Sequence, residues 1–479
     1  MLDYMRMQYA PRREARRVGI AESLYSVSPI WIQNTMVSLK GLGLKMQRYG
    51  PEYRRFKRSL PSVYKLCRAE ALDHQMRLFR GIVSYAMNHS RFYAELYKGF
   101  NVEDIKCIED LGLLPTVDKE TIRKNIDSVY TIPVFRALEG HTGGTTGKSL
   151  VVRFTWTDMQ RRMADLDYFR ERHGFRHGMR RAVFSGKHLV YPSDENKRCF
   201  WRDNWALGQR FYSTFHLSEN NMQLYIDDLN EYCPNVLEGF TSCIVDLCRY
   251  VERKGQKIAF RPVAVFPTSE PLFPEQREVI RRVLGVEPRD QYASSEGAPF
   301  IFECEEGSLH YALHTGIIEV GSDGQGIVTS FTSYGTPLIR YLIGDKFEVC
   351  SSRCSCGWDT PVFARIEGRV IDYLFSRERG RIYSPNLSNV VKSFPNSVVQ
   401  TQFIQRSIDC VTVKVVVDQR RFDEDRDADT IRREVAIRMG AGVRIDVQVV
   451  DQIARESSGK TRFVVNDLQN QCASVSSSR

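Results

Sequence analysis

The residues best suited to chemistry stand together in one glycine-rich stretch, from His141 to Ser149. It holds three glycines and three threonines in nine residues, with Lys148 near its end. Such a segment resists helix and strand formation, and its backbone can approach an anion and surround it with N–H and hydroxyl donors. The spacing is not that of a Walker A loop, because Thr142 stands where that motif requires its first glycine. The stretch predicts a phosphate-binding loop, with an ordinary surface turn as the alternative.

Further stretches carry polar residues at positions suited to a ligand site. Tyr292 lies four residues before the carboxylate of Glu296, where a strand is expected to end. Asp345 follows a glycine in an expected turn, and its carboxylate could accept hydrogen bonds from two ribose hydroxyls. Asp372 lies at an expected joint between domains, and Lys460 lies in a polar loop near the C-terminus. Each residue taken singly has a plain structural explanation, and only the set indicates a common site.

A cluster of cysteines with one histidine predicts a metal site. Cys304 and His310 lie six residues apart, and Cys354 and Cys356 follow, with Cys350 as a reserve ligand. Three thiolates and one imidazole complete a tetrahedral structural zinc site. The alternative is an accidental cluster, because the chain contains 12 cysteines.

Length and composition predict a soluble globular protein of two or three domains, with 479 residues, of which 42% are hydrophobic and 26% charged. The formal net charge of +10 is modest, and no array of basic and aromatic residues suggests binding to nucleic acid. Much of the positive charge lies in the first 60 residues. A solvated helical face explains that charge, and peripheral contact with anionic lipid is the alternative.

Neither a membrane span nor a signal peptide is expected. The moderately apolar segment from Ile30 to Leu44 is interrupted by polar residues well short of the roughly 20 residues that a span requires. The first residues lack an apolar core followed by a cleavage site. We therefore expect a cytoplasmic protein with reduced cysteines.

The hydrophobic pattern predicts an α/β architecture. Residues 62–98 have helical spacing, and between 155 and 290 strand-like pieces such as 182–184 and 263–266 alternate with helical ones such as 275–284. Strands are expected at 399–404, 411–417 and 443–450, with Ile431, Val435 and Met439 on one helix face. A small α+β unit of about 100 residues thus ends the chain.

In this order and spacing, the motifs resemble those of the adenylate-forming superfamily of acyl- and aryl-CoA synthetases. Within it, the chain is similar to the phenylacetate-CoA ligase-like branch that includes capsule polysaccharide biosynthesis (CapK-like) proteins, from about residue 60 to 470. The resemblance implies a large N-terminal adenylation domain of several subdomains, at 61–371, after a basic helical extension at 1–60. A small mobile α+β domain at 372–479 would follow. It also implies a similar zinc site of Cys, His and Cys-x-Cys.

The resemblance also implies a role for each matching residue. Tyr292 and Ser295 would bind the nucleotide beside its adenine, Glu296 would help to hold Mg²⁺, and Asp345 would bind the ribose. Arg369 would reach the nucleotide, Asp372 would lie at the hinge, and Lys460 would act in catalysis on the substrate carboxylate. The residues expected to hold the ATP β- and γ-phosphates are Thr142, Gly143, Gly144, Thr145, Thr146, Gly147 and Lys148.

The implied activity is activation of a carboxylic acid with ATP, followed by acyl transfer to coenzyme A. Alternatives are amide formation on an amino sugar or amino acid in polysaccharide biosynthesis, and a non-catalytic nucleotide- or sugar-binding scaffold. The acid is expected beside residues 239–242 and 268–272 and Tyr292, with Phe184, Phe240 and Phe266 favouring an aryl or compact acyl group. The sequence leaves the acid, the acceptor and the oligomeric state open.

Overall fold

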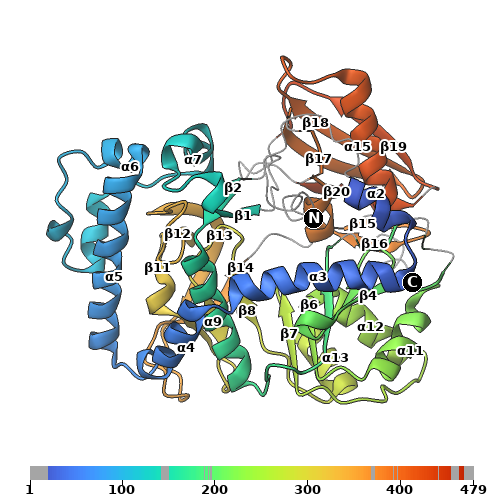
Figure 1. Ribbon diagram of the computed structural model, residues 1–479, viewed down its shortest axis with the longest axis horizontal. Helices are drawn as coiled ribbons and strands as arrows, with labels where there is room; N and C mark the ends of the chain where they lie inside the picture. Colours follow the sequence, from blue (N-terminus) through green and yellow to red (C-terminus); the bar gives the residue numbers. More distant parts are fainter. Residues whose placement is uncertain are drawn as a thin grey trace, which may run out of the picture.

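The computed structural model describes residues 20–141, 150–187, 189–191, 194, 197–367, 373–391, 393–395, 397–440, 442–454 and 463–468. Three larger sheets organise these residues, each with helices packed against it (Figure 1). Among the described residues, no helix has the length and hydropathy needed to cross a bilayer. The mixed α/β class expected from the sequence is confirmed.

The first part of the chain is helical. Its α-helices are α2 (Ile20–Val27), α3 (Ile30–Arg48), α4 (Pro51–Val63), α5 (Arg68–His89), α6 (Arg91–Leu96), α7 (Lys119–Lys124) and α8 (Ile126–Val129). Three short 3-10 helices accompany them, η1 (Val102–Asp104), η2 (Ile108–Leu113) and η3 (Val134–Arg136). Helix α5 buries Met76, Ile82 and Ala86, as their spacing predicts. Helix α7 begins after Asp118, whose side chain accepts a hydrogen bond from the Thr121 amide.

A seven-stranded antiparallel sheet forms one body, in the order β11-β12-β13-β14-β10-β9-β8. Its strands are β8 (Gln291–Tyr292), β9 (Ile301–Glu303), β10 (Leu309–Tyr311), β11 (Gly316–Val320), β12 (Gln325–Ser330), β13 (Tyr341–Cys350) and β14 (Val362–Glu367), with η5 (Leu313–Thr315) between β10 and β11. Helix α5 packs along it, so that residues from α5, β12 and β13 share one hydrophobic cluster. A short hairpin of β1 (Leu138–His141) and β2 (Val151–Phe154) precedes this sheet in the chain.

A five-stranded sheet in the order β4-β5-β3-β6-β7 forms the second body, and all of its neighbours are parallel except β4 and β5. Its strands are β3 (Arg181–Ser185), β4 (Trp201–Asn204), β5 (Gln209–Ser213), β6 (Val236–Phe240) and β7 (Ala264–Thr268), with η4 (Trp205–Leu207) after β4. The accompanying helices are α9 (Trp156–Arg172), α11 (Met222–Tyr232), α12 (Thr241–Arg253) and α13 (Pro274–Leu284). The expected alternation of strands and helices is therefore present.

The C-terminal body has a four-stranded sheet in the order β19-β18-β17-β20. Its elements are β15 (Tyr373–Ser376), β16 (Gly380–Tyr383), α14 (Ser384–Val391), β17 (Val398–Ser407), β18 (Cys410–Val417), α15 (Glu424–Met439), β19 (Arg444–Val449) and β20 (Val464–Asn466). Ile431, Val435 and Met439 are fully buried on one face of α15, as predicted. We propose that a domain boundary lies near Asp372, which falls outside the described residues.

Helix α3 packs against the five-stranded sheet at β4 and the adjoining η4 (Figure 1). A buried polar network attaches it to the sheet, because the Gln33 amide and the Arg202 guanidinium both donate to Asp194 Oδ2, at 3.1 and 2.8 Å. Gly41 allows the closest approach, since a Cβ on that residue would lie 2.0 Å from the side-chain oxygen of the buried Asn204. The first helices are thus an integral part of this body.

We predict that Gly41→Leu lowers the free energy of unfolding by about 1 to 3 kcal/mol or more, because the new side chain must push α3 away from β4. Gly81→Leu is the matched control, since this helical glycine has open space around it. That control should be neutral or stabilising, because leucine is the better helix former. Denaturant unfolding of both variants checks this, and equal stabilities would contradict the close packing of α3.

Candidate active site

The turn that carries Glu296 is held by a buried arginine. The turn follows β8, and its Gly297 has a φ of 93°, a conformation that glycine adopts without strain. Arg162 of α9 donates from Nη1 to the Gly297 and Ala298 carbonyl oxygens, at 2.9 and 3.2 Å. Charge-assisted hydrogen bonds of this kind are strong, and burial lowers the pKa of Arg162 only to about 10. The guanidinium therefore stays charged and fixes the turn.

Tyr292 and Asp345 lie in contact, although their strands β8 and β13 are separated by three other strands in the sheet order. The Tyr292 hydroxyl donates to Asp345 Oδ2 at 2.7 Å. The Tyr292 ring also meets the Phe347 ring edge to face, at 5.4 Å between centroids. The sheet must therefore be curled, so that β8 at its edge comes close to β13. This closure places the aromatic ring of Tyr292 beside the Asp345 carboxylate, which lies within strand β13 and not in the turn expected from the sequence.

Glu296 has a neighbour that sequence reasoning did not assign to the site. Lys119, the first residue of α7, lies with its ammonium 3.9 Å from Glu296 Oε1. The segment before α7 is held beside β13, because Val117 exchanges backbone hydrogen bonds with Arg340 and Leu342. A lysine at the start of a capped helix carries no sequence signal for this role, and only the packing of α7 on β13 reveals it.

The glycine-rich stretch connects β1 to β2. His141 and Val151 are paired in the hairpin, so the residues on either side of the stretch lie next to each other. The hairpin also meets the Glu296 turn, since a Cβ on Gly140 would lie 3.3 Å from the Ser295 carbonyl oxygen. The chain therefore leads into and out of this stretch beside Ser295. Thr142 to Lys148 lie outside the described residues, as do Arg369 and Lys460.

The expected acid-binding segments meet at the carboxyl ends of parallel strands. Strand register places Gly239 of β6 between Phe184 and Pro267 of its neighbours, and ligands of α/β sheets bind at such ends. Gly239 cannot carry a side chain, because a Cβ would lie 1.9 Å from the Phe184 carbonyl oxygen. Phe184 and Phe266 are fully buried in hydrophobic clusters, and this core packing accounts for both aromatic side chains.

A buried carboxyl group, Glu270, joins two of these segments. Its oxygens accept hydrogen bonds from the Ser242 amide at 2.6 Å and from the Ser242 hydroxyl at 2.9 Å. Burial outweighs these hydrogen bonds and raises the pKa of Glu270 from 4.5 to about 7. Near neutral pH this carboxyl group is therefore poised between its charged and neutral forms.

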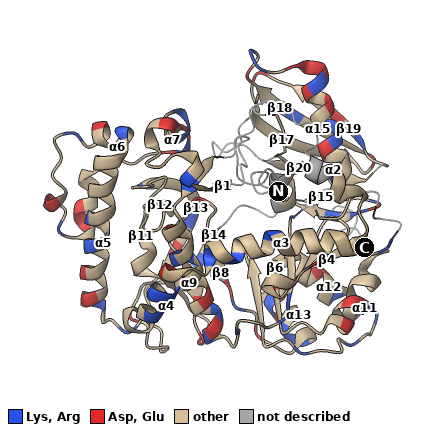
Figure 2. Cartoon of the chain, viewed as in Figure 1, with Lys and Arg blue, Asp and Glu red and all other residues tan. Residues whose placement is uncertain are grey.

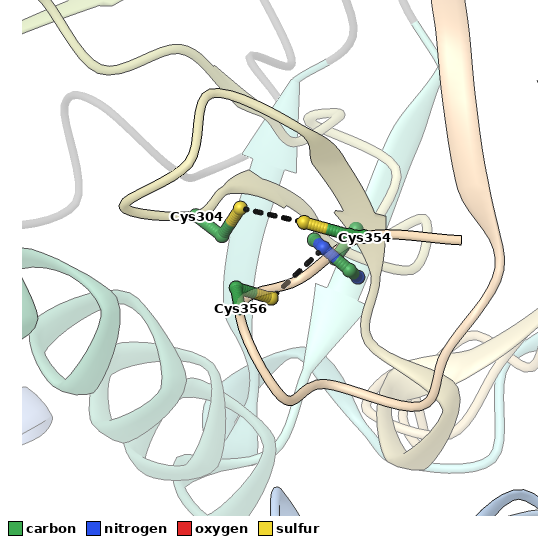
Figure 3. Close-up of side chains that lie close together, drawn as sticks. Cys304, Cys354 and Cys356 are labelled. Carbon is green, nitrogen blue, oxygen red and sulfur yellow. Dashed lines mark hydrogen bonds between the residues drawn. The ribbon is translucent and has the colours of Figure 1, made fainter. Parts of the chain in front are cut away.

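The four predicted metal ligands converge. Cys304 follows β9, His310 lies in β10, and Cys354 and Cys356 lie between β13 and β14, yet their donor atoms all lie within 4.8 Å of one another. Figure 3 shows the three thiols turned toward a common centre. Cys304 Sγ is 3.6 Å from Cys354 Sγ, and Cys356 Sγ is 3.3 Å from His310 Nε2. These atoms could hold a metal ion, whereas Cys350 is not part of the cluster and its thiol contacts Ser352.

Without a metal ion, the surroundings of the cluster favour the metal-binding form of the histidine but not of two of the thiols. Burial lowers the pKa of His310 to about 4, so the imidazole is neutral at ordinary pH. Its Nδ1 lies 3.0 Å from the Thr360 hydroxyl, which orients Nε2 toward the thiols. Burial also raises the pKa of the Cys304 and Cys356 thiols, the latter to about 12. A bound cation would reverse this effect, because it stabilises thiolates.

We predict that Glu270 makes stability depend on pH. Because its folded-state pKa is raised, the stabilisation by its proton is complete below pH 4.5 and is lost as the pH rises through about 7. Glu270→Gln keeps an acceptor for the Ser242 amide without the titration. Between pH 5 and 8, its free energy of unfolding should gain up to about 3 kcal/mol relative to the wild type.

Denaturant unfolding at both pH values measures this difference. Glu275→Gln, at the exposed start of α13, is the matched control and should run parallel to the wild type. A Glu270→Gln protein that also runs parallel would contradict the buried titration.

Sequence and structure comparisons relate the chain to known proteins. It is 35% identical to protein CapK of Staphylococcus aureus over 459 residues, which cover 93% of this chain and 99% of CapK. It is 23% identical to the phenylacetate-coenzyme A ligase of Thermus thermophilus, over 85% of this chain and 98% of that ligase. The structure of a 2-hydroxyisobutyryl-CoA ligase in its postadenylation state aligns with a TM-score of 0.55 and 18% identity, over 87% of this chain and 94% of that one.

These relationships confirm the resemblance inferred from the motifs. The structural match establishes the fold of adenylate-forming ligases, and the sequence relationship to the phenylacetate-CoA ligases confirms the expected class, an AMP-forming ligase. A family model of the CapK C-terminal domain matches residues 374–467, which span the C-terminal body described above. With this match at its end and 35% identity along nearly its whole length, the chain belongs to the CapK family.

Proposed function

We propose that this chain activates a carboxylic acid with ATP as an acyl adenylate and then transfers the acyl group to coenzyme A. The observation that carries the proposal is the contact of Tyr292 with Asp345, across a curled sheet, beside the Glu296 turn and the hairpin around the glycine-rich stretch. An aromatic face, a ribose acceptor, a carboxylate and a phosphate-binding loop are the parts that an ATP site requires. The names of the related ligases support the same activity.

Each part of the site would then have one task. The Tyr292 ring would pack on the adenine, and Asp345 would accept the ribose hydroxyls. Residues 142–148 would hold the β- and γ-phosphates, with Arg369 also reaching the nucleotide. Glu296 would hold Mg²⁺, which neutralises developing charge on the phosphates. Lys119 would compensate the charge of Glu296 when no cation is bound, because the two groups already form an ion pair.

The reaction would proceed in two displacements. A carboxylate oxygen of the acid bonds to the α-phosphorus of ATP, and the bond to the bridging oxygen breaks, releasing pyrophosphate. Lys460 would stabilise the negative charge of this step. The thiolate of coenzyme A then bonds to the acyl carbon, and AMP leaves with the carboxyl oxygen.

The C-terminal body would have to move between these steps. It rests on the five-stranded sheet through Tyr383, which donates to Asp246 at 2.9 Å, and Asn386, which accepts from Thr214 at 2.8 Å. Arg381 adds an ion pair with the same Asp246 at 3.8 Å, and polar partners that exchange for water cost little to separate. A rotation about the segment near Asp372 would therefore be accessible, as domain closure in enzymes often requires.

An amine acceptor is the second candidate. The 35% relationship is to CapK, whose name specifies no coenzyme A, whereas the named CoA ligases are more distant. An amino sugar or amino acid would attack the same acyl carbon through its nitrogen and give an amide. A non-catalytic scaffold is the third candidate, but a magnesium carboxylate and a catalytic lysine would serve no purpose in it.

We also propose that Cys304, His310, Cys354 and Cys356 hold one structural zinc ion. A tetrahedral site with metal–sulfur distances of about 2.3 Å requires neighbouring thiolates roughly 3.8 Å apart, and the Cys304 and Cys354 sulfurs are 3.6 Å apart. Three thiolates and an imidazole also suit zinc better than magnesium or calcium. Four protein ligands leave no open position, so this ion would join β9, β10 and the loop before β14. It requires reduced thiols, in keeping with a cytoplasmic location.

We predict that pyrophosphate release from ATP and Mg²⁺ depends on one acid within a panel of aryl, short acyl and sugar-derived carboxylic acids. Coenzyme A should then give a thioester, because thiolate attack on an acyl adenylate is the proposed second step. Hydroxylamine traps the adenylate when no acceptor is present. Product formation only with an amine would favour the amide synthase, and nucleotide binding without release for any acid would favour the scaffold.

The matched variants for this assay are Asp345→Asn and Asp323→Asn. Loss of the charged ribose acceptor should raise the KM for ATP by roughly tenfold or more. Asp323 lies in an exposed turn, where its side chain accepts a hydrogen bond from the Gln325 amide, and its variant should behave as the wild type. Equal KM values would contradict the placement of the ribose at Asp345.

We predict about one zinc per chain in freshly purified, reduced protein. Cys356→Ser should lose the metal and lower the thermal midpoint, because the closed site then lacks one of its four ligands. Cys350→Ser is the control and should keep its zinc. Metal analysis with calorimetry checks this, and the proposal fails if the wild type holds none or if both variants retain it.

A further inference from the structure

Helix α3 is attached to the protein largely by polar and small residues and turns several apolar side chains outward. Gln33, Gly41 and Gly43 are buried against the body, together with Val37, which packs on Val183 and Phe211. On the opposite face, the exposed fractions are 67% for Trp31 and 62% for Met46. Leu39 and Leu42, exposed by 47% and 49%, lie between them at helical spacing. This orientation is the reverse of an ordinary surface helix, whose apolar face points into the core.

The apolar face continues beyond α3. In the preceding α2, Leu24 and Val27 are exposed by 56% and 78%. Trp205 of η4, exposed by 60%, lies alongside, because its amide donates to the Ser38 hydroxyl of α3 at 3.0 Å. We call Leu24, Val27, Trp31, Leu39, Leu42, Met46 and Trp205 the outer stripe. Exposed apolar side chains gathered in this way mark an interaction surface.

Helix α3 and the segment before α2 carry an excess of positive charge. Helix α3 contains Lys40, Lys45 and Arg48 and no acidic residue, so Figure 2 shows it without red. The 19 residues before α2 contain five arginines and two acidic residues. Tryptophan and leucine on one side with lysine and arginine at the flank are typical of helices that lie in the interface of an anionic membrane.

We propose that the outer stripe docks on an anionic lipid surface, with α3 lying in the plane of the headgroups. Trp31 and Trp205 would enter the boundary between headgroups and acyl chains, where amphipathic rings are favoured. Lys45 would meet lipid phosphates. A second copy of the chain fits less well, because two such helices would bring lysine and arginine together with no acidic partner.

Flotation of the full-length protein with vesicles tests this. Wild type should bind phosphatidylcholine vesicles that contain phosphatidylglycerol, and it should bind less at high salt or to phosphatidylcholine alone. Trp31→Ser with Met46→Ser should lower the partition coefficient by about tenfold or more. The matched control is Leu113→Ser with Val449→Ser, two exposed apolar residues elsewhere, and it should bind as the wild type.

The charge is tested separately. Lys45→Glu should weaken binding several-fold, whereas Lys254→Glu, on an exposed residue after α12, should not. Adenylation activity in solution should be unchanged in all variants, which shows that they fold.

Three results would overturn the proposal. The first is a wild type that binds no anionic vesicle, including the case in which only a protein lacking residues 1–19 binds, since that segment would then cover the outer stripe. The second is equal binding of the two double variants. The third is a dimer in sedimentation that the Trp31→Ser and Met46→Ser changes dissociate while vesicle binding stays the same.

Discussion

The candidate site depends on one buried cation, Arg162. A guanidinium removed from water is tolerated only when its donors are paired, and Arg162 uses Nη1 for the Gly297 and Ala298 carbonyls and for the Thr332 hydroxyl. These acceptors lie directly after Glu296 and beyond β12. Asp158, one helical turn earlier, accepts from the Tyr334 amide at 3.0 Å. Helix α9 therefore anchors the Glu296 turn through Arg162 and the segment after β12 through Asp158.

The candidate site also depends on the curl of the seven-stranded sheet. Because β8 returns to β13, Tyr292 meets Asp345. The four candidate metal ligands meet for a different reason, since β9, β10 and β14, beside which they lie, are neighbours in the sheet. The residues proposed to bind the nucleotide and those proposed to hold the metal thus lie on one sheet.

The attachment of the N-terminal helices follows a different rule. Arg202 and Asp194 are fully buried and form an ion pair at 2.8 Å, and Gln33 of α3 hydrogen-bonds to both of them. Once a polar residue is needed to satisfy a buried ion pair, the helix must turn that face inward. Its leucines, methionine and tryptophan are then left outside. The same contact of Gln33 therefore pairs the buried polar groups and leaves the opposite, apolar side of α3 exposed.

The sequence by itself determined the order and kind of the elements. Periodicity placed α5, α13 and α15, and the β-branched runs placed β17 and β18, because local hydrophobic spacing records which face is buried. It also singled out the four candidate metal ligands, since thiol and imidazole groups are the usual donors to zinc. The resemblance to the adenylate-forming family pointed to Tyr292, Glu296 and Asp345.

Only the tertiary structure decided which of these groups touch and which surfaces stay free. The ion pair of Glu296 with Lys119 joins residues far apart in the chain, and it depends on the bridge between Val117 and β13. The hydrogen bonds from Ser242 to Glu270 depend on the register of β6 and β7, because one of these residues follows each strand. The outward face of α3 could not be read from its composition, because its orientation is set by Asp194 and Arg202, more than 150 residues later in the chain. These contacts depend on long-range packing, which produces no periodic pattern in the sequence.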